Sequence, residues 1–164
     1  ERFRWLAGLI AAHPERKLVG RTRLQKEVWL LQRMRMPSGY DFRMHYFGPY
    51  SEGVQAEVNL LQRFGLVSEE KGPTSNEGGY YSTFIASAEA DLPELVPFKL
   101  YIDKLDKTDV TILELAATYD MCRKAGLPHN AALGFLRNKK GEKCAGGKED
   151  SALALLSELG LPVS

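Results

Sequence analysis

Apolar residues recur every three or four positions through much of the N-terminal half, which is typical of helices that bury one face. The pattern predicts three helices, at residues 2–12, 22–34 and 51–64. Pro14 ends the first run, because proline cannot continue a helix. Thr22 and Gln25 have the spacing of a capping box, and Ser51 is a favourable N-cap residue.

The chain between the second and third predicted helices reads YDFRMHYFGPYS. Phe42, Met44 and Tyr46 alternate with polar residues, as expected of a half-buried strand. Gly48 and Pro49 are expected to end this strand and to start the corner that leads into the third helix.

Two strand-like runs follow the third helix, LVSEEKG and GYYSTFIA, with a loop rich in Pro, Gly, Ser and Asn between them. This pattern predicts a β-hairpin with a long tip. Three helices followed by a hairpin is the element order of a winged helix. We therefore expect an α+β, mainly helical protein whose residues 1–90 form a winged-helix-like domain.

After Pro93 the pattern is helical throughout. It predicts helices at residues 93–104, 109–124, 128–138 and 149–159. The helix at 109–124 is apolar on more than one side, which indicates a buried helix. The stretch KKGEKCAGGKED is expected to be a linker or a mobile loop. We expect residues 91–164 to form a helical bundle that packs with residues 1–90 as one unit.

Composition agrees with a folded protein, because 164 residues with 44% hydrophobic content are enough for a sizeable core. No apolar run approaches 18 residues, and the opening segment is amphipathic. We therefore expect no membrane span, no signal peptide and a cytoplasmic location. Cys122 and Cys144 have no metal-binding or redox spacing and are expected to be free thiols.

The net charge of +1 does not by itself indicate a nucleic-acid partner. Basic residues nevertheless flank the second predicted helix: Arg16, Lys17, Arg21, Arg23, Lys26, Arg33 and Arg35. Two interpretations are open, a solvated helix face and a patch that binds a phosphate group or an acidic partner.

DNA binding is the first function that a winged helix suggests, with one helix in the major groove and the wing on phosphates. The exposed face predicted for helix 51–64 is instead acidic and amide-rich, with Arg63 as its single basic residue. The predicted wing carries Glu69, Glu70 and Glu77 against Lys71. Because DNA affinity comes mostly from Lys and Arg contacts to phosphates, DNA is the second choice of partner.

Four ring residues surround the Gly-Pro step: His45, Tyr46, Phe47 and Tyr50. One interpretation is core packing around a turn. The other is a pocket or groove toward which Arg23, Lys26, His45 and Tyr50 all point, since Tyr and His offer flat contact area at small entropy cost.

Catalytic chemistry finds little support in the sequence. His13, His45 and His129 are isolated, and GEKCAGGK lacks the spacing of a phosphate-binding loop. A metal site at Asp41 and His45 is a weaker interpretation than a surface histidine. We expect no enzymatic activity, no cofactor and no metal site.

The stretches RLQKEVWLLQ, YDFRMHYFGPYSEGVQAEVNLLQRFGLV and LELAATYDMCRKAG together resemble the YwgA-like uncharacterised proteins. These are distant kin of the Panacea antitoxin domain, the group that includes the SocA antitoxin. The resemblance implies a prokaryotic or phage-associated regulator without enzymatic activity. Relatives of the SocA type hold a toxin or deliver it to a protease, and some members carry helix-turn-helix domains for DNA.

We therefore expect a regulatory module that binds another macromolecule, with a protein favoured, such as a toxin or a protease system. The alternative is a winged-helix transcriptional regulator that binds DNA, and either could act as a homodimer. The candidate binding residues are Arg21, Arg23, Lys26, His45, Tyr46, Tyr50 and Arg63.

Overall fold

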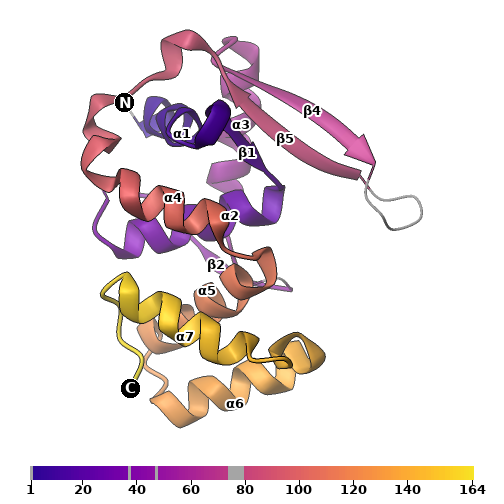
Figure 1. Cartoon of the computed structure of the whole chain (residues 1–164), viewed down its shortest axis with the longest axis vertical. Helices are drawn as coiled ribbons and strands as arrows, with labels where there is room; N and C mark the ends of the chain where they lie inside the picture. The colour runs from indigo at the N-terminus through magenta and orange to yellow at the C-terminus, as the bar shows by residue number, and fades with distance from the viewer. Residues whose placement is uncertain (1, 37, 47, 74–79) are drawn as a thin grey trace. The chain divides into compact units, whose positions relative to one another are not determined.

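The computed structural model describes residues 2–36, 38–46, 48–73 and 80–164 (Figure 1). Two residues named above, Phe47 and Glu77, lie outside the described residues, as does the predicted hairpin tip. The described part contains seven α-helices and two small antiparallel sheets. The predicted α+β, mainly helical class is confirmed.

The chain forms two compact units that alternate along the sequence. Unit 1 comprises Glu1–Leu24, Ser38–Asp41 and Ser51–Lys107, and unit 2 comprises Gln25–Pro37, Phe42–Tyr50 and Thr108–Ser164. This grouping differs from the sequence-based division near residue 90, because two segments of the N-terminal half belong with the C-terminal helices. Helix α2 (Arg21–Arg33) begins in unit 1 and ends in unit 2.

Unit 1 contains a three-stranded sheet in the order β1-β5-β4. Its elements up to the sheet are α1 (Arg2–Ala11), the 3₁₀ helix η1 (Pro14–Arg16), β1 (Lys17–Val19), α3 (Glu52–Arg63), β4 (Val67–Pro73) and β5 (Tyr80–Ala86). The hairpin β4–β5 confirms the prediction from sequence. Strand β1, which pairs Leu18 with Phe84, was missed, because three residues are too few to show a period.

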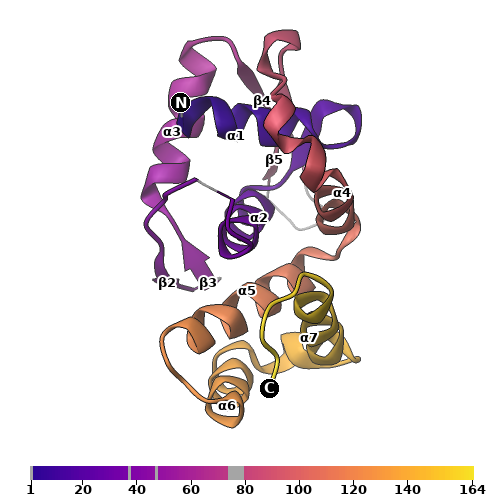
Figure 2. The same ribbon diagram turned by 90° about the vertical axis from the view of Figure 1, so that its left-hand side faces the viewer.

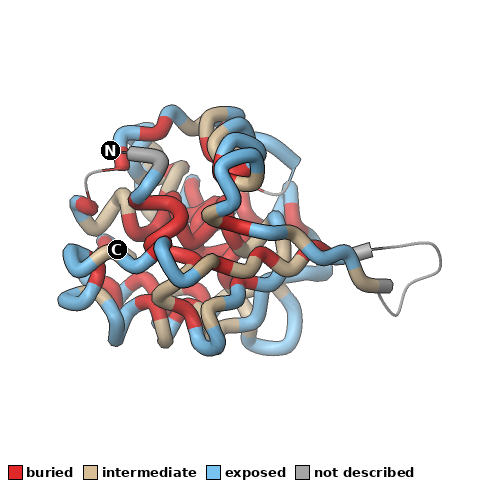
Figure 3. Tube along the Cα trace, turned by 90° about the horizontal axis from the view of Figure 1, so that it is seen from above, coloured by how far each residue is buried: buried red, intermediate tan, exposed pale blue. Residues whose placement is uncertain are grey.

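The core of unit 1 lies between the helices and the sheet, and α1 contacts both α3 and β5. Its fully buried apolar residues include Leu6, Leu9, Ile10, Val54, Val58, Leu61 and Phe84. Figure 3 shows the buried positions alternating with exposed ones along the trace, which is the periodicity that predicted these helices. Ser51 caps α3 as predicted, because its hydroxyl accepts a hydrogen bond from the Val54 amide at 3.3 Å.

The predicted helix 93–104 has two parts in the structure. The 3₁₀ helices η2 (Ala88–Ala90) and η3 (Pro93–Phe98) precede the α-helix α4 (Lys99–Lys107). Pro97 lies inside η3 and has no amide hydrogen to donate, so α-helical pairing starts only after it.

Unit 2 is built around α5 (Val110–Lys124), which contacts the two other helices of its C-terminal segment (Figure 2). These are α6 (His129–Lys140) and α7 (Lys148–Glu158). Helix α5 is buried at every position from Leu113 to Asp120, which confirms the predicted buried helix. The predicted linker KKGEKCAGGKED is wrong over most of its length, because the end of α6, the 3₁₀ helix η4 (Gly141–Cys144) and the start of α7 occupy it.

The segment around the Gly-Pro step, with its four ring residues, contains a short antiparallel hairpin of β2 (Arg43–His45) and β3 (Gly48–Tyr50). The predicted half-buried strand is wrong, since all three residues of β2 are exposed. Gly48 and Pro49 do not end the extended segment; they are the buried residues of β3, which contacts α5. Strand β3 of the hairpin therefore packs against α5, and strand β2 is exposed.

Candidate functional site

The β2–β3 hairpin lies close against α5 because β3 begins with a glycine. Gly48 has a φ of +93°, and a Cβ there would overlap the Thr118 hydroxyl oxygen. The same Cβ would lie 3.6 Å from Lys26 Cε. Only glycine combines this backbone angle with so close an approach.

Two buried ammonium groups hold the hairpin backbone. Lys26 on α2 donates a hydrogen bond to the Pro49 carbonyl at 2.7 Å. Lys140, the last residue of α6, donates to the Tyr46 carbonyl at 2.6 Å. Lys26 is 2% exposed and Lys140 is 8% exposed, so both bonds are shielded from water and strengthened by the low local dielectric.

Glu114 on α5 supplies the counter-charge. Its carboxylate lies 3.3 Å from the Lys140 ammonium and 2.9 Å from the Lys143 ammonium. We call Lys26, Glu114, Lys140 and Lys143 the lysine cluster. The cluster thus contains two lysines beside one carboxylate, and Lys26, whose pKa Glu114 also affects, lies in the same buried region.

Burial lowers the pKa of Lys26 from 10.5 to about 8; Glu114 opposes this shift, while Lys140 and Lys143 add to it. Burial also lowers the pKa of Lys140, again against the attraction of Glu114. Desolvation disfavours an ammonium ion, and neighbouring ammonium groups repel it, so both effects lower the pKa of a lysine.

A pocket of about 440 Å³ adjoins the hairpin. We call it the hairpin pocket, and it is lined by Met44, His45, Tyr46, Thr118, Phe135, Lys139 and Lys140. The His45 ring lies 5.2 Å from the Tyr46 ring and 5.3 Å from the Tyr50 ring, measured between centroids. Tyr46 itself is 86% exposed, although its carbonyl is held by a buried lysine.

Four of the predicted binding residues belong to unit 2, where Lys26, His45, Tyr46 and Tyr50 all lie on or beneath the hairpin. Lys26 was expected on an exposed basic face, and its side chain is instead buried. Of the four residues expected to point into one pocket, Arg23, Lys26, His45 and Tyr50, only His45 lines the hairpin pocket.

The other three predicted residues belong to unit 1. Arg21 forms an ion pair with Glu69 at 2.7 Å, and Arg23 donates to the Leu105 carbonyl at 2.6 Å. Arg63 is exposed at the end of α3.

Much of the predicted basic face of α2 takes part in internal ion pairs. Arg16 pairs with Asp91 at 2.5 Å, and Arg33 pairs with Asp120 at 2.8 Å. The structure therefore does not contain a basic face that is solvated along its whole length.

The predicted wing is less acidic than its sequence indicated. Burial alone would raise the pKa of Glu69, but hydrogen bonds from Ser82, Arg21 and Gln62 hold it below its ordinary value. Glu69 is thus an ionised, paired carboxylate in which Arg21 offsets the charge.

Sequence reasoning missed Glu114, Thr118 and Lys140. Glu114 and Thr118 are four residues apart, so they lie on one face of α5. Both are polar residues inside a helix that is apolar nearly all round. Such groups must find partners within the protein, so their positions could have indicated a buried polar site. Lys140 gave no signal, since a lysine at a helix end is ordinarily solvated.

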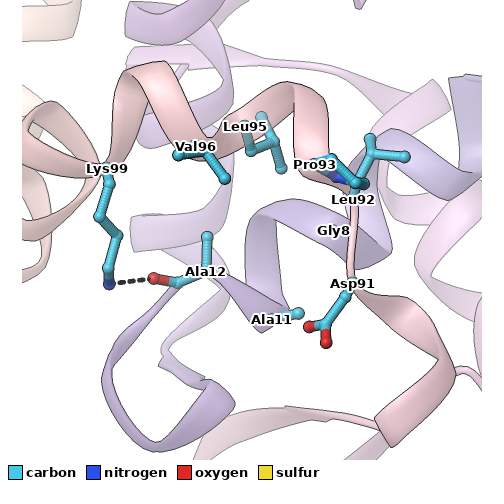
Figure 4. A pocket seen from close by; sticks show the side chains of 9 residues that line it. All are labelled: Gly8, Ala11, Ala12, Asp91, Leu92, Pro93, Leu95, Val96 and Lys99. Carbon is cyan, nitrogen blue, oxygen red and sulfur yellow. Dashed lines mark hydrogen bonds between the residues drawn. The ribbon is translucent and has the colours of Figure 1, made fainter.

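A second pocket, of about 470 Å³, lies in unit 1 (Figure 4). It is lined by Gly8, Ala11, Ala12, Asp91, Leu92, Pro93, Leu95, Val96 and Lys99. Lys99 donates to the Ala12 carbonyl at 2.5 Å, and Asp91 accepts from Arg16, so its charged groups already have partners. The rest of the lining is apolar and gives this pocket no evident chemistry.

Within the described ranges, no three His, Cys, Asp or Glu side chains gather as a metal site would require. No helix in that part of the chain has the length and apolar character needed to cross a bilayer. Cys122 and Cys144 are free thiols, the first buried and the second partly exposed.

No protein-family model matches the chain. The chain is similar to the uncharacterised protein YwgA of Bacillus subtilis (strain 168), with 30% identity over 112 residues. The matched region covers 62% of this chain and 64% of YwgA, so the chain spans less than two thirds of that relative. The resemblance to YwgA is thus supported by a direct comparison, and it brings no activity with it.

Proposed function

We propose that this chain is a non-catalytic interaction module that binds a protein partner through the β2–β3 hairpin and the hairpin pocket. The observation that carries the proposal is Tyr46, a residue that is 86% exposed while its carbonyl is fixed by the buried Lys140 ammonium. An exposed aromatic ring on a rigid backbone is favourable for binding, because little conformational freedom remains to be lost.

The surroundings of Tyr46 support the same use. Met44 is 37% exposed and the His45 ring lies beside the Tyr46 ring, so residues 44–46 place a sulfur-containing side chain and two rings next to one another along the chain. Tyrosine is enriched among the residues that dominate interface energies, and methionine adapts to varied partners.

The kind of partner is proposed from the distant kinship of the YwgA-like proteins with the Panacea antitoxin domain. We propose an antitoxin-like or adaptor-like role, in which the partner is a toxin or a component of a protease system. A homodimer is compatible with this role.

A winged-helix transcriptional regulator is the second candidate. The observation that favours it is the pairing of β1 with β5, which gives unit 1 the helices α1 and α3 beside a three-stranded sheet that ends in the β4–β5 hairpin. The exposed Arg63 on α3 would contact phosphate. Exposed Glu52 on the same helix opposes this use.

The test compares Tyr46→Ala with Tyr81→Ala, a matched control in which the replaced ring is 44% exposed on β5 of unit 1. Each variant is immobilised and exposed to an extract of the source organism, and retained proteins are identified by mass spectrometry. Affinity for the purified partner is then measured by calorimetry. We expect Tyr46→Ala to weaken binding by about 30-fold, the loss of about 2 kcal/mol typical of a central anchor, and Tyr81→Ala to leave it unchanged.

Equal affinity of wild type and Tyr46→Ala for the purified partner would contradict the proposal. Duplex DNA binding is measured in parallel at 150 mM salt. Sequence-selective binding well below micromolar concentration that is lost in Arg63→Ala and retained in Tyr46→Ala would favour the second candidate.

A further inference from the structure

We propose that the hairpin pocket is an oxyanion site that takes an acidic side chain of the protein partner, a carboxylate or a phosphate group. This inference rests on the proposed function, and it names the chemistry that the docking surface recognises.

The lining of the hairpin pocket is basic. It includes the side chains of Lys139 and Lys140, and its described residues include no carboxylate. Lys139 is exposed, and its ammonium lies 6.0 Å from the centre of the Phe135 ring. Its charge is therefore available to a ligand.

The lysine cluster extends this positive charge beneath the pocket. Glu114 is 3% exposed and lies within 3.3 Å of two ammonium groups, while Lys26 adds a third within the same buried region. Lys140 belongs to this cluster and also lines the hairpin pocket, so an anion there would lie beside a buried positive charge that water screens poorly.

Thr118 provides an independent sign of a missing ligand. Its hydroxyl oxygen is buried, and the described residues offer it no hydrogen-bond partner. Thr118 is 0% exposed and lines the hairpin pocket. A buried hydroxyl without a partner is unfavourable, and an oxyanion accepts a hydrogen bond from it.

The remaining lining explains why a side chain fits better than a free ion. Met44, Tyr46 and Phe135 contribute apolar surface, and a volume of about 440 Å³ exceeds what a single carboxylate or phosphate group would fill. A side chain places its methylene groups or its ring against this apolar surface and its charge against the lysines.

The experiment uses capped tripeptides, acetyl-Ala-X-Ala-amide, with glutamate, phosphoserine or glutamine at X, together with inorganic phosphate. Binding to the isotope-labelled chain is followed by NMR through the amide resonances of Tyr46, Thr118 and Lys139. We expect saturable shifts with the glutamate or phosphoserine peptide and none with the glutamine peptide.

Two variants locate the site, and one is a control. Lys139→Gln should weaken peptide binding at least fivefold, and Thr118→Val, which keeps the side-chain shape, at least threefold. Lys124→Gln removes the same charge from an exposed position outside the pocket and should change the affinity less than twofold.

Equal binding of the glutamine peptide, or equal weakening by Lys124→Gln, would overturn the proposal. Binding of inorganic phosphate without either acidic peptide would show that the occupant is a free ion, which also overturns it. If the peptides fail while Tyr46→Ala still weakens binding of the purified partner, the oxyanion site is wrong and the proposed function stands.

Discussion

Unit 1 and unit 2 differ in their most buried ion pair, although both contain exposed pairs, such as Arg137–Glu149 in unit 2. In unit 1, the side chains of the Arg16–Asp91 pair are 34% and 70% exposed, and those of Lys99–Asp103 are 47% and 34% exposed. In unit 2, both side chains of the Lys140–Glu114 pair are only 4% exposed.

This difference supports the proposal that recognition takes place in unit 2. Exposed ion pairs contribute little to stability and are easily replaced. Buried charges are expensive to desolvate, and replacing them with apolar residues is often neutral or favourable, so their presence calls for an explanation beyond stability. We infer that the lysine cluster positions the hairpin and charges the pocket beside it.

Each unit contains one buried tryptophan, so the unfolding of each unit can be followed separately. Trp5 belongs to unit 1 and Trp29 to unit 2, and both are less than 7% exposed. Fluorescence of Trp5 in a Trp29→Phe background follows unit 1, and fluorescence of Trp29 in a Trp5→Phe background follows unit 2. The free energy of unfolding is then measured by urea titration, and each variant is compared with its own background.

The largest effect is expected from Glu114→Gln. The change leaves the Lys26 and Lys140 ammonium groups buried without their counter-charge, and removal of one partner of a buried pair costs about 3–5 kcal/mol. Asp103→Asn in unit 1 is the control, and loss of its exposed pair with Lys99 should cost about 0.5 kcal/mol. A loss below about 1 kcal/mol for Glu114→Gln would remove the distinction between the units.

The second largest effect is expected from Gly48→Ala in unit 2. The new Cβ would overlap the Thr118 hydroxyl, and the φ of +93° is unfavourable for alanine, so we expect a loss of about 2–4 kcal/mol. Gly65→Ala in unit 1 has a φ of +73° and open space around the new Cβ, so only the backbone strain of about 1 kcal/mol remains.

A double variant separates strain from overlap. Thr118→Ala combined with Gly48→Ala should recover the part of the loss that comes from the overlap. Equal losses for Gly48→Ala and Gly65→Ala would mean that the hairpin does not depend on close approach to α5.

The contrast between the units also separates what the sequence could predict from what it could not. The helices and the β4–β5 hairpin of unit 1 follow from local periodicity, and the Ser51 cap was readable for the same reason. In unit 2, Gly48 and Pro49 resembled a strand end, yet their contact with α5 makes them the buried strand. That contact joins segments some 70 residues apart in the sequence, which no local pattern records.

The candidate site was predicted in part for the same physical reason. The cluster of His45, Tyr46 and Tyr50 is local and was anticipated from composition. The lysine cluster brings together residues 26, 114, 140 and 143. Lysine and glutamate are rarely buried, so their types favoured a solvated interpretation until the fold placed them together.

The third effect is a pH dependence of unit 2. Below pH 8 the folded and unfolded forms both carry a charged Lys26, whereas between pH 8 and 10.5 the folded form has released a proton that the unfolded form retains. The free energy of unfolding should therefore rise with pH, by about 2 kcal/mol from pH 8 to pH 10. Lys26→Met should reduce this rise, while the lowered pKa of Lys140 leaves a smaller rise of the same sign.

The measurement is the difference between the Lys26→Met variant and its background across the pH series, followed through Trp29. The difference should change steadily above pH 8 and stay level from pH 6.5 to pH 7.5. A constant difference over the whole range would show that Lys26 does not titrate with a lowered pKa. It would then no longer support the conclusion that unit 2 contains costly buried charges.

The smallest effect is expected from the helix caps, where the two units should not differ. Ser51 caps α3 in unit 1, and Asp109 caps α5 in unit 2 by accepting from the Thr111 amide at 2.7 Å and the Ile112 amide at 3.4 Å. Loss of a capping side chain costs about 1 kcal/mol, so Ser51→Ala and Asp109→Ala should each destabilise their own unit by that amount. Asp109→Asn keeps a capping oxygen without the charge and should cost less than Asp109→Ala. If Asp109→Ala instead approached the loss expected for Glu114→Gln, unit 2 would be sensitive to every local change, and the special role of its buried charges would not hold.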